Sequence, residues 1–278
     1  PEGGEPLLWG MFWCGMNGES QEWWECEFTP ERPGLYFYHF EIHTCRGIQR
    51  IAKGERGTGV LGGTNQWQLT VYSRDFTTPE WLLGGIMYQI LPDRFANSGS
   101  PKGVVPYGRT FHEDWHGQPD WAPNEKGEVT NTDFFGGDLR GIQEKLPYLK
   151  SLGVTCIYLN PIFESHSNHR YDTADYSRID PLLGTEKDFR ELCEKAKALG
   201  VRIIIDGVFS HTGSDSVYFN KEGRYPGPGA YQTQQSPYSS WYSFYNWPDG
   251  YDCWWNFNTL PNVNETDGGY DRYINGPQ

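Results

Sequence analysis

Two patterns of hydrophobic positions divide the chain near residue 78. Residues 1–78 contain short alternating or aromatic runs, separated by clusters of Gly, Pro and Asn. The clearest run covers residues 34–42 and follows the turn signal Pro33-Gly34, and the others cover residues 7–13, 23–28 and 66–72. Short strands with turn signals between them predict a small β-sandwich over residues 1–78.

Compact apolar runs and helical repeats alternate after residue 78. Residues 85–91, 154–159 and 201–206 are short apolar runs, as expected of strands buried on both faces. Helical spacing recurs between them, first in Leu139, Ile142, Leu146, Leu149 and Leu152, then in Phe189, Leu192, Ala196 and Leu199. Thr185 and Asp188 resemble a capping box at the start of the second helix. Pro147 predicts a break in the first helix, or a new helical start.

The order strand, helix, strand, helix, strand predicts an α/β fold with a parallel sheet and right-handed crossovers. Both a (β/α)8 barrel and a doubly wound sheet begin in this way. No glycine-rich phosphate-binding motif follows any of the strands, which argues against a nucleotide-binding protein. Residues 212–265 are polar and aromatic without clear periodicity, and loops of that length are usually functional. Another helix is expected to start within residues 266–278.

Charge and composition exclude several partners. The chain has 278 residues, and 36 acidic against 23 basic residues give a net charge of −13, so we expect no nucleic acid as a partner. No apolar run reaches the roughly 18–20 residues of a membrane span, so we expect no membrane contact either. The six cysteines form no CxxC motif, which argues against a zinc site. The aromatic fraction of 16% suits a neutral polyhydroxylated ligand, although aromatic residues also fill cores.

Polar side chains follow each predicted strand, where a parallel barrel carries its working groups. Asp206-x-x-x-x-His211 closes the third strand, and Tyr171-Asp-Thr-Ala-Asp-Tyr176 follows the second. These segments are similar to glycoside hydrolase family 13, the α-amylase family. Residues 88–95, 134–139 and 260–264 resemble its neopullulanase, maltogenic amylase and cyclomaltodextrinase branch.

The resemblance implies a domain order for the chain. Residues 1–78 would be a starch-binding-type β-sandwich, and residues 79–211 the first part of an incomplete (β/α)8 TIM barrel. Residues 212–265 would be a subdomain inserted after the third strand, and residues 266–278 the start of the next helix. Three strands cannot close a barrel, so we expect a fragment with exposed edges that is poorly soluble or partly unfolded.

The implied function is hydrolysis of α-glucans, namely starch, pullulan, maltooligosaccharides or cyclodextrins, by a retaining mechanism. In the family, the catalytic carboxylates follow the fourth, fifth and seventh strands, so we assign no catalytic residue in these three strands. The resemblance implies that Tyr171 is a stacking platform for the sugar and that His211 donates to a sugar hydroxyl. Asp206 would organise its neighbours and add negative potential near an oxocarbenium ion. Each residue also has an ordinary structural explanation. Tyr171 would pack at the rim, Asp206 would cap a loop, and His211 would be a hydrogen-bonded histidine at the end of a strand.

Asn97, Asp138 and the backbone of Gly136 match positions where this branch binds calcium through oxygen ligands. Residues 98–100 read Ser-Gly-Ser, so acidic or amide ligands are fewer than in related chains. Asp138 also fits the N-cap of a helix, and both roles can coexist. Calcium is therefore an expected cofactor with an incomplete ligand set.

A second hypothesis is a non-catalytic carbohydrate-binding or scaffold protein. It is motivated by the expected N-terminal sandwich and by the missing catalytic carboxylates. Maltooligosaccharide binding without hydrolysis would favour it over the enzyme. The sequence leaves open a homodimer, and it leaves open whether the protein is cytoplasmic or secreted.

Overall fold

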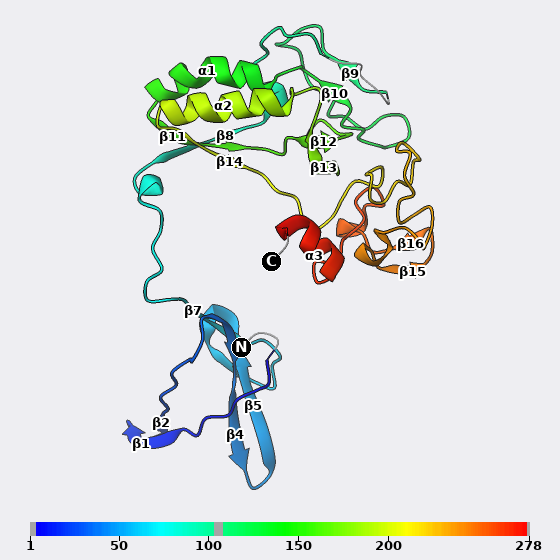
Figure 1. Cartoon of the computed structure of the whole chain (residues 1–278). Helices are drawn as coiled ribbons and strands as arrows, with labels where there is room; N and C mark the ends of the chain where they lie inside the picture. Colours follow the sequence, from blue (N-terminus) through cyan, green and yellow to red (C-terminus); the bar gives the residue numbers. More distant parts are fainter. Residues whose placement is uncertain (1–3, 103–107, 277–278) are drawn as a thin grey trace. The chain divides into compact units, whose positions relative to one another are not determined.

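The computed structural model describes residues 4–102 and 108–276 of the chain. The chain divides into two compact units, unit 1 (Pro1–Thr78) and unit 2 (Pro79–Gln278) (Figure 1). Each unit has its own strands and is described by itself.

Unit 1 consists of antiparallel strands. One two-stranded sheet pairs β1 (Phe12–Asn17) with β2 (Gln21–Glu25), and another pairs β3 (Gly34–Tyr38) with β7 (Trp67–Val71). A three-stranded sheet contains β4 (Phe40–Thr44), β5 (Gly47–Lys53) and β6 (Gly59–Leu61). The run 34–42 is thus two strands that part at His39. Trp67 joins them, because its ring centroid lies 5.6 Å from that of Tyr38 and 5.4 Å from that of Phe40. The packing of two sheets into a sandwich stays a prediction.

Unit 2 is built on a three-stranded parallel sheet of β8 (Ile86–Ile90), β11 (Val154–Leu159) and β14 (Arg202–Ile205) in the order β14-β11-β8. The helices α1 (Leu139–Ser151) and α2 (Glu186–Ala198) lie on one side of this sheet (Figure 1). The predicted order of strands and helices is confirmed. The result is a partial TIM-barrel-like fold.

N-terminal caps set where α1 and α2 begin, and the buried face of each helix sets how it packs on the sheet. The side chain of Asp138 accepts from the backbone N–H of Gly141 and caps α1, and Thr185 and Asp188 form the predicted capping box of α2. The buried faces meet in one aliphatic core made of Ile90, Leu139, Ile142, Leu146, Leu149, Val154, Ile157, Leu159, Ile162, Leu183, Leu192, Ala196 and Val201. Burial of this apolar area holds the helices against the sheet.

The prediction that Pro147 breaks the first helix was wrong. Helix α1 runs without interruption from Leu139 to Ser151 with Pro147 inside. Proline has no N–H, so the carbonyl of Gln143 loses its usual helical donor. Leu146 and Leu149 are fully buried on either side of Pro147. Their burial in the aliphatic core keeps the segment helical despite the missing hydrogen bond.

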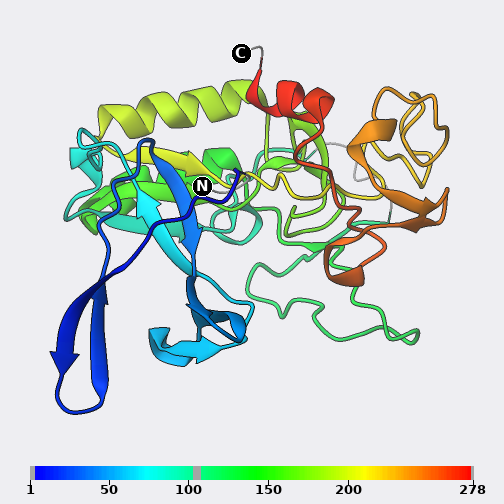
Figure 2. The ribbon, with the colours of Figure 1, turned by 90° about the horizontal axis from the view of Figure 1, so that it is seen from below.

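The remaining elements of unit 2 are short and lie in the long loops. The strands are β9 (Thr110–Phe111), β10 (Asp133–Phe134), β12 (Phe163–Ser165), β13 (Thr173–Ile179), β15 (Phe244–Asn246) and β16 (Gly250–Tyr251), followed by helix α3 (Gly268–Asn275). Single 3-10 turns are η1 (Glu55–Gly57) in unit 1 and η2 (Glu80–Leu82), η3 (Pro92–Arg94), η4 (Ser239–Trp241) and η5 (Trp254–Asn256) in unit 2. Figures 1 and 2 show β15, β16 and α3, in orange and red, beyond the carboxyl end of the sheet.

A second core forms within the long excursion after β14. It is mostly aromatic and consists of Tyr218, Phe219, Ala230, Trp241, Tyr242, Tyr251, Val263 and Tyr270. Of the four tryptophans in this excursion, Trp241 is buried in this core, whereas Trp247, Trp254 and Trp255 are exposed. Over the described ranges, no helix is long and apolar enough to cross a bilayer.

Candidate functional site

A line of hydrogen bonds crosses the carboxyl ends of the three parallel strands. Gln89 of β8 donates through Nε2 to Oδ1 of Asn160, at 2.8 Å, and Asn160 follows β11 directly. The amide of Asn160 lies 3.3 Å from the phenol oxygen of Tyr171, and that phenol donates to Oδ2 of Asp206 at 2.9 Å. Asp206 follows β14. The structure thus brings together Tyr171 and Asp206, which the sequence analysis singled out separately.

The carboxylate of Asp206 holds the phenol of Tyr171 in its neutral form. Burial and the hydrogen bond to Asp206 raise the pKa of Tyr171 to about 12. Burial and the same carboxylate also raise the pKa of Tyr158, on β11. The two phenols therefore remain hydrogen-bond donors at neutral pH, and they converge on one acidic group at the end of β14.

His211 lies behind Tyr171 rather than at its hydroxyl. Its Nε2 is 3.0 Å from the backbone carbonyl of Tyr171, and because a carbonyl only accepts, Nε2 carries the proton. Nδ1 then accepts from the hydroxyl of Ser210, at 3.0 Å. Burial lowers the pKa of His211, which favours the neutral ring. Both ring nitrogens are used within the protein, so donation by His211 to a sugar hydroxyl stays a prediction.

The loop that carries Tyr171 is anchored by Asp172, to which the sequence analysis gave no role. The carboxylate of Asp172 accepts from the hydroxyl of Ser165 at 2.9 Å and from the backbone N–H of Ser167 at 3.2 Å. The hydroxyl of Ser167 also donates to Asp172. Two serines before an acidic residue in a polar loop give no periodic signal, and only the folded loop shows that they share one acceptor.

A buried ion pair fixes the same loop from its other side. Arg170 is fully buried in the left-handed backbone region, at φ 62°, and its Nε lies 2.9 Å from Oδ2 of the buried Asp180. The guanidinium also lies over the ring of Phe134, at 5.5 Å from its centroid. The side chain of Arg170 thus orients the backbone from which Tyr171 projects.

Two of the three positions expected to bind calcium, Asp138 and Asn97, are already engaged with protein partners. Asp138 accepts from the backbone N–H of Gly141 at 2.6 Å through Oδ1, and its Oδ2 accepts from Ser98 and pairs with the ammonium of Lys102. Asn97 accepts through Oδ1 from a backbone N–H at 2.8 Å. One carboxylate already paired with a cation, one amide oxygen and one backbone carbonyl fall short of the six to eight oxygens that calcium takes, so this arrangement does not fit the ion.

A second group of side chains that could bind a metal ion lies near a cavity in the loop between β8 and α1. The ligand atoms of His112, Asp120 and Asp133 lie within 4.8 Å of one another. Asp133, however, accepts from the amide of Asn168 at 2.8 Å and pairs with the guanidinium of Arg94 at 3.4 Å. The guanidinium already supplies a positive charge there, which disfavours a metal ion.

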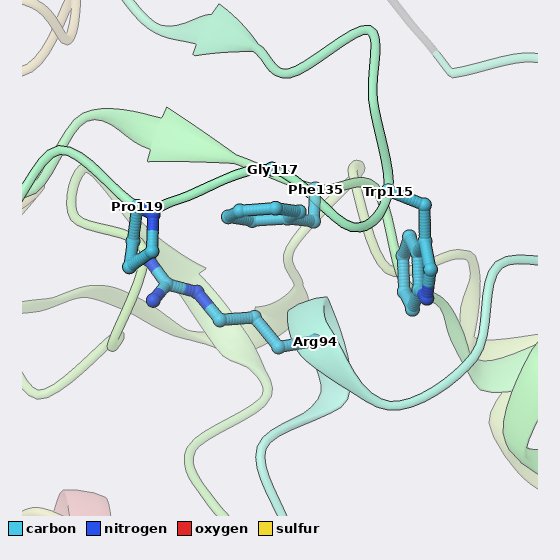
Figure 3. Close-up of a pocket in the computed structure, with 5 residues that line it drawn as sticks. All are labelled: Arg94, Trp115, Gly117, Pro119 and Phe135. Carbon is cyan, nitrogen blue, oxygen red and sulfur yellow. The ribbon is translucent and has the colours of Figure 1, made fainter.

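Arg94 also lines the adjoining cavity. This cavity measures about 280 Å³ and is lined by Arg94, Trp115, Gly117, Pro119 and Phe135 (Figure 3). Arg94 extends along the face of Phe135, with its guanidinium carbon 5.1 Å from the ring centroid. Trp115 closes one end of this space (Figure 3).

Comparison with known proteins relates the same residues to enzymes of glucan breakdown. A family model described as the catalytic domain of α-amylase matches residues 89–267. Amylopullulanase from Thermoanaerobacterium saccharolyticum is 42% identical over 273 residues, which cover 90% of this chain and 21% of that protein. Neopullulanase 2 from Thermoactinomyces vulgaris is 39% identical over 186 residues, or 67% of this chain and 28% of that protein.

A solved structure gives the same relation in three dimensions. The type III pullulan hydrolase from Thermococcus kodakarensis superposes with a TM-score of 0.58 at 32% identity, over 82% of this chain and 41% of that one. The chain spans less than a third of the length of the two curated relatives named above. The matched range includes the hydrogen-bonded line from Gln89 to Asp206.

Proposed function

Because this chain belongs to the α-amylase family, we propose that the whole protein is a glycosidase that hydrolyses α-glucans. The substrate class is starch, pullulan, maltooligosaccharides or cyclodextrins, and names such as amylopullulanase and neopullulanase 2 among the relatives support it. The observation that carries the proposal is the line of hydrogen bonds from Gln89 to Asp206. It gathers polar side chains at the carboxyl ends of three parallel strands, where barrel enzymes bind their substrates.

Tyr171 is the proposed stacking platform for a glucose ring. Its hydroxyl is held by Asp206 and Asn160, so the ring cannot turn without breaking two hydrogen bonds. An oriented aromatic face packs against the apolar C–H face of a sugar and fixes its position for reaction. His211 and the Asp172 loop act behind it by positioning its backbone.

Asp206 supplies negative potential on the side of the site formed by β14. A retaining glycosidase passes through transition states with oxocarbenium character, and a fixed carboxylate nearby stabilises that positive charge. We assign neither the nucleophile nor the general acid to a residue of this chain. The residues described here bind and orient the sugar, and the proposed mechanism needs no calcium ion at Asp138.

The experiment uses the whole protein with pullulan, maltoheptaose and β-cyclodextrin. We expect new reducing ends from at least one of these substrates. Proton NMR of the first product should show the α-anomer, because two displacements retain the configuration. Failure to cleave any of the three would contradict the proposed function, and a β-anomer as first product would contradict the retaining mechanism.

We propose glucan binding as a second function, carried by unit 1 as a starch-binding-type β-sandwich. Trp13 and Trp24 face each other across the β1–β2 pair, and their exposed fractions are 57% and 49%. Two neighbouring exposed indoles on one face form a platform that suits a polysaccharide.

Electrophoresis of the whole protein through a gel containing amylopectin tests this second function. The double variant Trp13→Ala/Trp24→Ala should lose most of the retardation that the wild type shows. Tyr72→Ala removes an exposed ring of unit 1 outside this strand pair and serves as the control. Equal retardation of the double variant and the wild type would show that the hairpin does not bind the polymer.

A further inference from the structure

Exposed aromatic rings extend outward from His211. We define the Trp254 cluster as Trp254, Trp255 and Phe257, whose exposed fractions are 38%, 79% and 54%. The ring centroids of Trp254 and His211 are 5.5 Å apart. Trp255 stacks on Trp254 at 5.1 Å with 15° between the planes, and Phe257 lies 6.3 Å from Trp254 at 24°. An exposed aromatic surface of this kind marks a place where a ligand binds.

The backbone holds Trp255 in an unusual conformation. Trp255 lies in the left-handed region at φ 48° and ψ 32°, and Asn256 follows at φ 63°. Bulky residues rarely adopt this region because their Cβ atom crowds the backbone. Hydrogen bonds from Trp254 N–H to the Leu260 carbonyl, at 2.9 Å, and from Phe257 N–H to the Trp254 carbonyl, at 3.0 Å, hold the turn. The ring of this strained residue touches Trp254 but is 79% exposed, so burial in a core does not explain its conformation.

A polar cavity adjoins the cluster on the same turn. It measures about 200 Å³ and is lined by Tyr245, Tyr251, Asp252, Cys253, Asn256, Asn258 and Asn262. Three of these side chains are amides, which both donate and accept hydrogen bonds, as a sugar hydroxyl does. No lysine or arginine stands among these lining residues, which disfavours a phosphate or another anion. Asn262 forms a β-bridge with His211, so the backbone of one lining residue is paired directly with the histidine behind Tyr171.

We propose that the Trp254 cluster and this amide-lined cavity form an outer subsite for one glucose unit of an α-glucan chain. The glucose ring stacks on Trp255, and its hydroxyls bond the amide of Asn256. Trp254 connects the subsite to the Tyr171 end through its contact with His211. The inference rests on the proposed function and adds to it. An outer subsite at Trp255 would make the protein prefer glucan chains that are long enough to reach this residue.

The test is the chain-length preference of the whole protein, measured as the ratio of kcat/KM for maltoheptaose to kcat/KM for maltotriose. For Trp255→Ala we expect this ratio to fall about tenfold, mainly through a higher KM for maltoheptaose. Trp255→Tyr keeps an aromatic face and should restore most of the ratio. Trp121→Ala removes another highly exposed indole of unit 2 and is the matched control, for which we expect the wild-type ratio.

A separate variant tests the proposed hydrogen bond between the sugar and the amide of Asn256. Asn256→Gly removes the side chain and leaves the left-handed backbone accessible, because glycine adopts that region without strain. We expect the ratio to fall in the same direction by about threefold, since one neutral hydrogen bond contributes less than a stacked ring.

Failure of the subsite and failure of the proposed function give different results. If the wild type cleaves both substrates and Trp255→Ala keeps the wild-type ratio, the outer subsite is refuted while the enzyme stands. If the wild type cleaves neither substrate, calorimetric titration of maltoheptaose decides the subsite, and the proposed function fails as well only if pullulan and β-cyclodextrin also stay intact. Weaker binding by Trp255→Ala than by Trp121→Ala would support the subsite, and equal binding would refute it.

Discussion

Unit 2 contains two cores of different chemistry, one on each side of the candidate site. The buried residues of the core between α1, α2 and the sheet are all aliphatic, and we call it the aliphatic core. The core within residues 212–265 and α3 consists mainly of rings, and we call it the aromatic core. Aliphatic side chains pack without direction, whereas buried phenols also need hydrogen-bond partners, as Tyr242 finds in Thr212 at 2.8 Å.

The difference in chemistry explains how the site is built. The aliphatic core carries the strand ends and therefore Asn160 and Asp206. The aromatic core carries the turn with Trp254, and it meets the strand ends at the bridge between His211 and Asn262. A rigid sheet thus positions one side of the site, while ring contacts between distant residues shape the other side. The following predictions separate the contributions of the two cores.

The largest expected effect is in the aromatic core. Phe219 is fully buried and contacts the rings of Tyr231, Tyr242, Phe244 and Tyr251. Phe219→Ala should lower the free energy of unfolding by about 3–5 kcal/mol, because it leaves a large cavity. Urea denaturation measures the loss, and Tyr245→Ala, at an exposed ring of the same region, should change it by less than about 0.5 kcal/mol. A loss for Phe219→Ala as small as for Tyr245→Ala would refute a packed aromatic core.

Leu146 tests the aliphatic core in the same way. It is fully buried beside Pro147, and Leu146→Ala should lower the free energy of unfolding by about 2–4 kcal/mol. Tyr148→Ala removes an exposed side chain of the same helix and is the control. Hydrogen exchange sharpens the comparison, since we expect Leu146→Ala to weaken protection in β11 more than in residues 212–265. Equal weakening in both regions would show that the two cores form one cooperative unit.

A smaller effect is expected at the start of α1, where Asp138 caps the helix. Asp138→Ala should lower the free energy of unfolding by about 1 kcal/mol, because the backbone N–H of Gly141 loses its acceptor. EDTA should leave the melting temperature of the wild type unchanged, because Lys102 rather than a metal ion pairs with the carboxylate. A melting temperature that falls on chelation and recovers with added calcium would show that the ion binds after all.

Another effect concerns pH and the loop between β12 and β13, which carries His166. Burial, together with Arg224 and Arg109, lowers the pKa of His166 to about 4 from an ordinary value of 6.5. The folded state therefore favours the neutral ring, and the stability this contributes is complete above pH 6.5 and is lost as the pH falls toward 4. The melting temperature should decline over this range less steeply in His166→Gln than in the wild type. Parallel declines would show that His166 does not contribute to the pH dependence.

Local signals made much of the aliphatic core predictable. The strand over residues 154–159 and the capping box of α2 follow from a short apolar run and from two residues three positions apart. Pro147 misled the prediction, because tertiary burial outweighed the missing hydrogen bond. The strands β5 and β6 of unit 1 and the pairing of β9 with β10 were not predicted, because short strands of mixed composition give little periodic signal.

The candidate site was predictable in part. The rule that working groups follow parallel strands, together with the resemblance to the α-amylase family, identified Tyr171 and Asp206, and the structure joins them by a hydrogen bond. The rule gave no role to Gln89 or Asn160, because an amide at a strand end looks like any loop residue until its partner is known. The ion pair between Lys102 and Asp138 spans 36 positions of sequence and has no local signature.

The carboxyl end of the sheet, with Asp206 beside Tyr171, is the place where we propose that the sugar reacts. The most direct measurement is kcat/KM of Asp206→Asn on pullulan or maltoheptaose, with the melting temperature of the variant measured in parallel. We predict a fall of about 100-fold or more at an unchanged melting temperature, because the substitution removes the charge and keeps a hydrogen-bond acceptor for Tyr171. A variant with wild-type kcat/KM would contradict the account, because the reaction would then take place elsewhere.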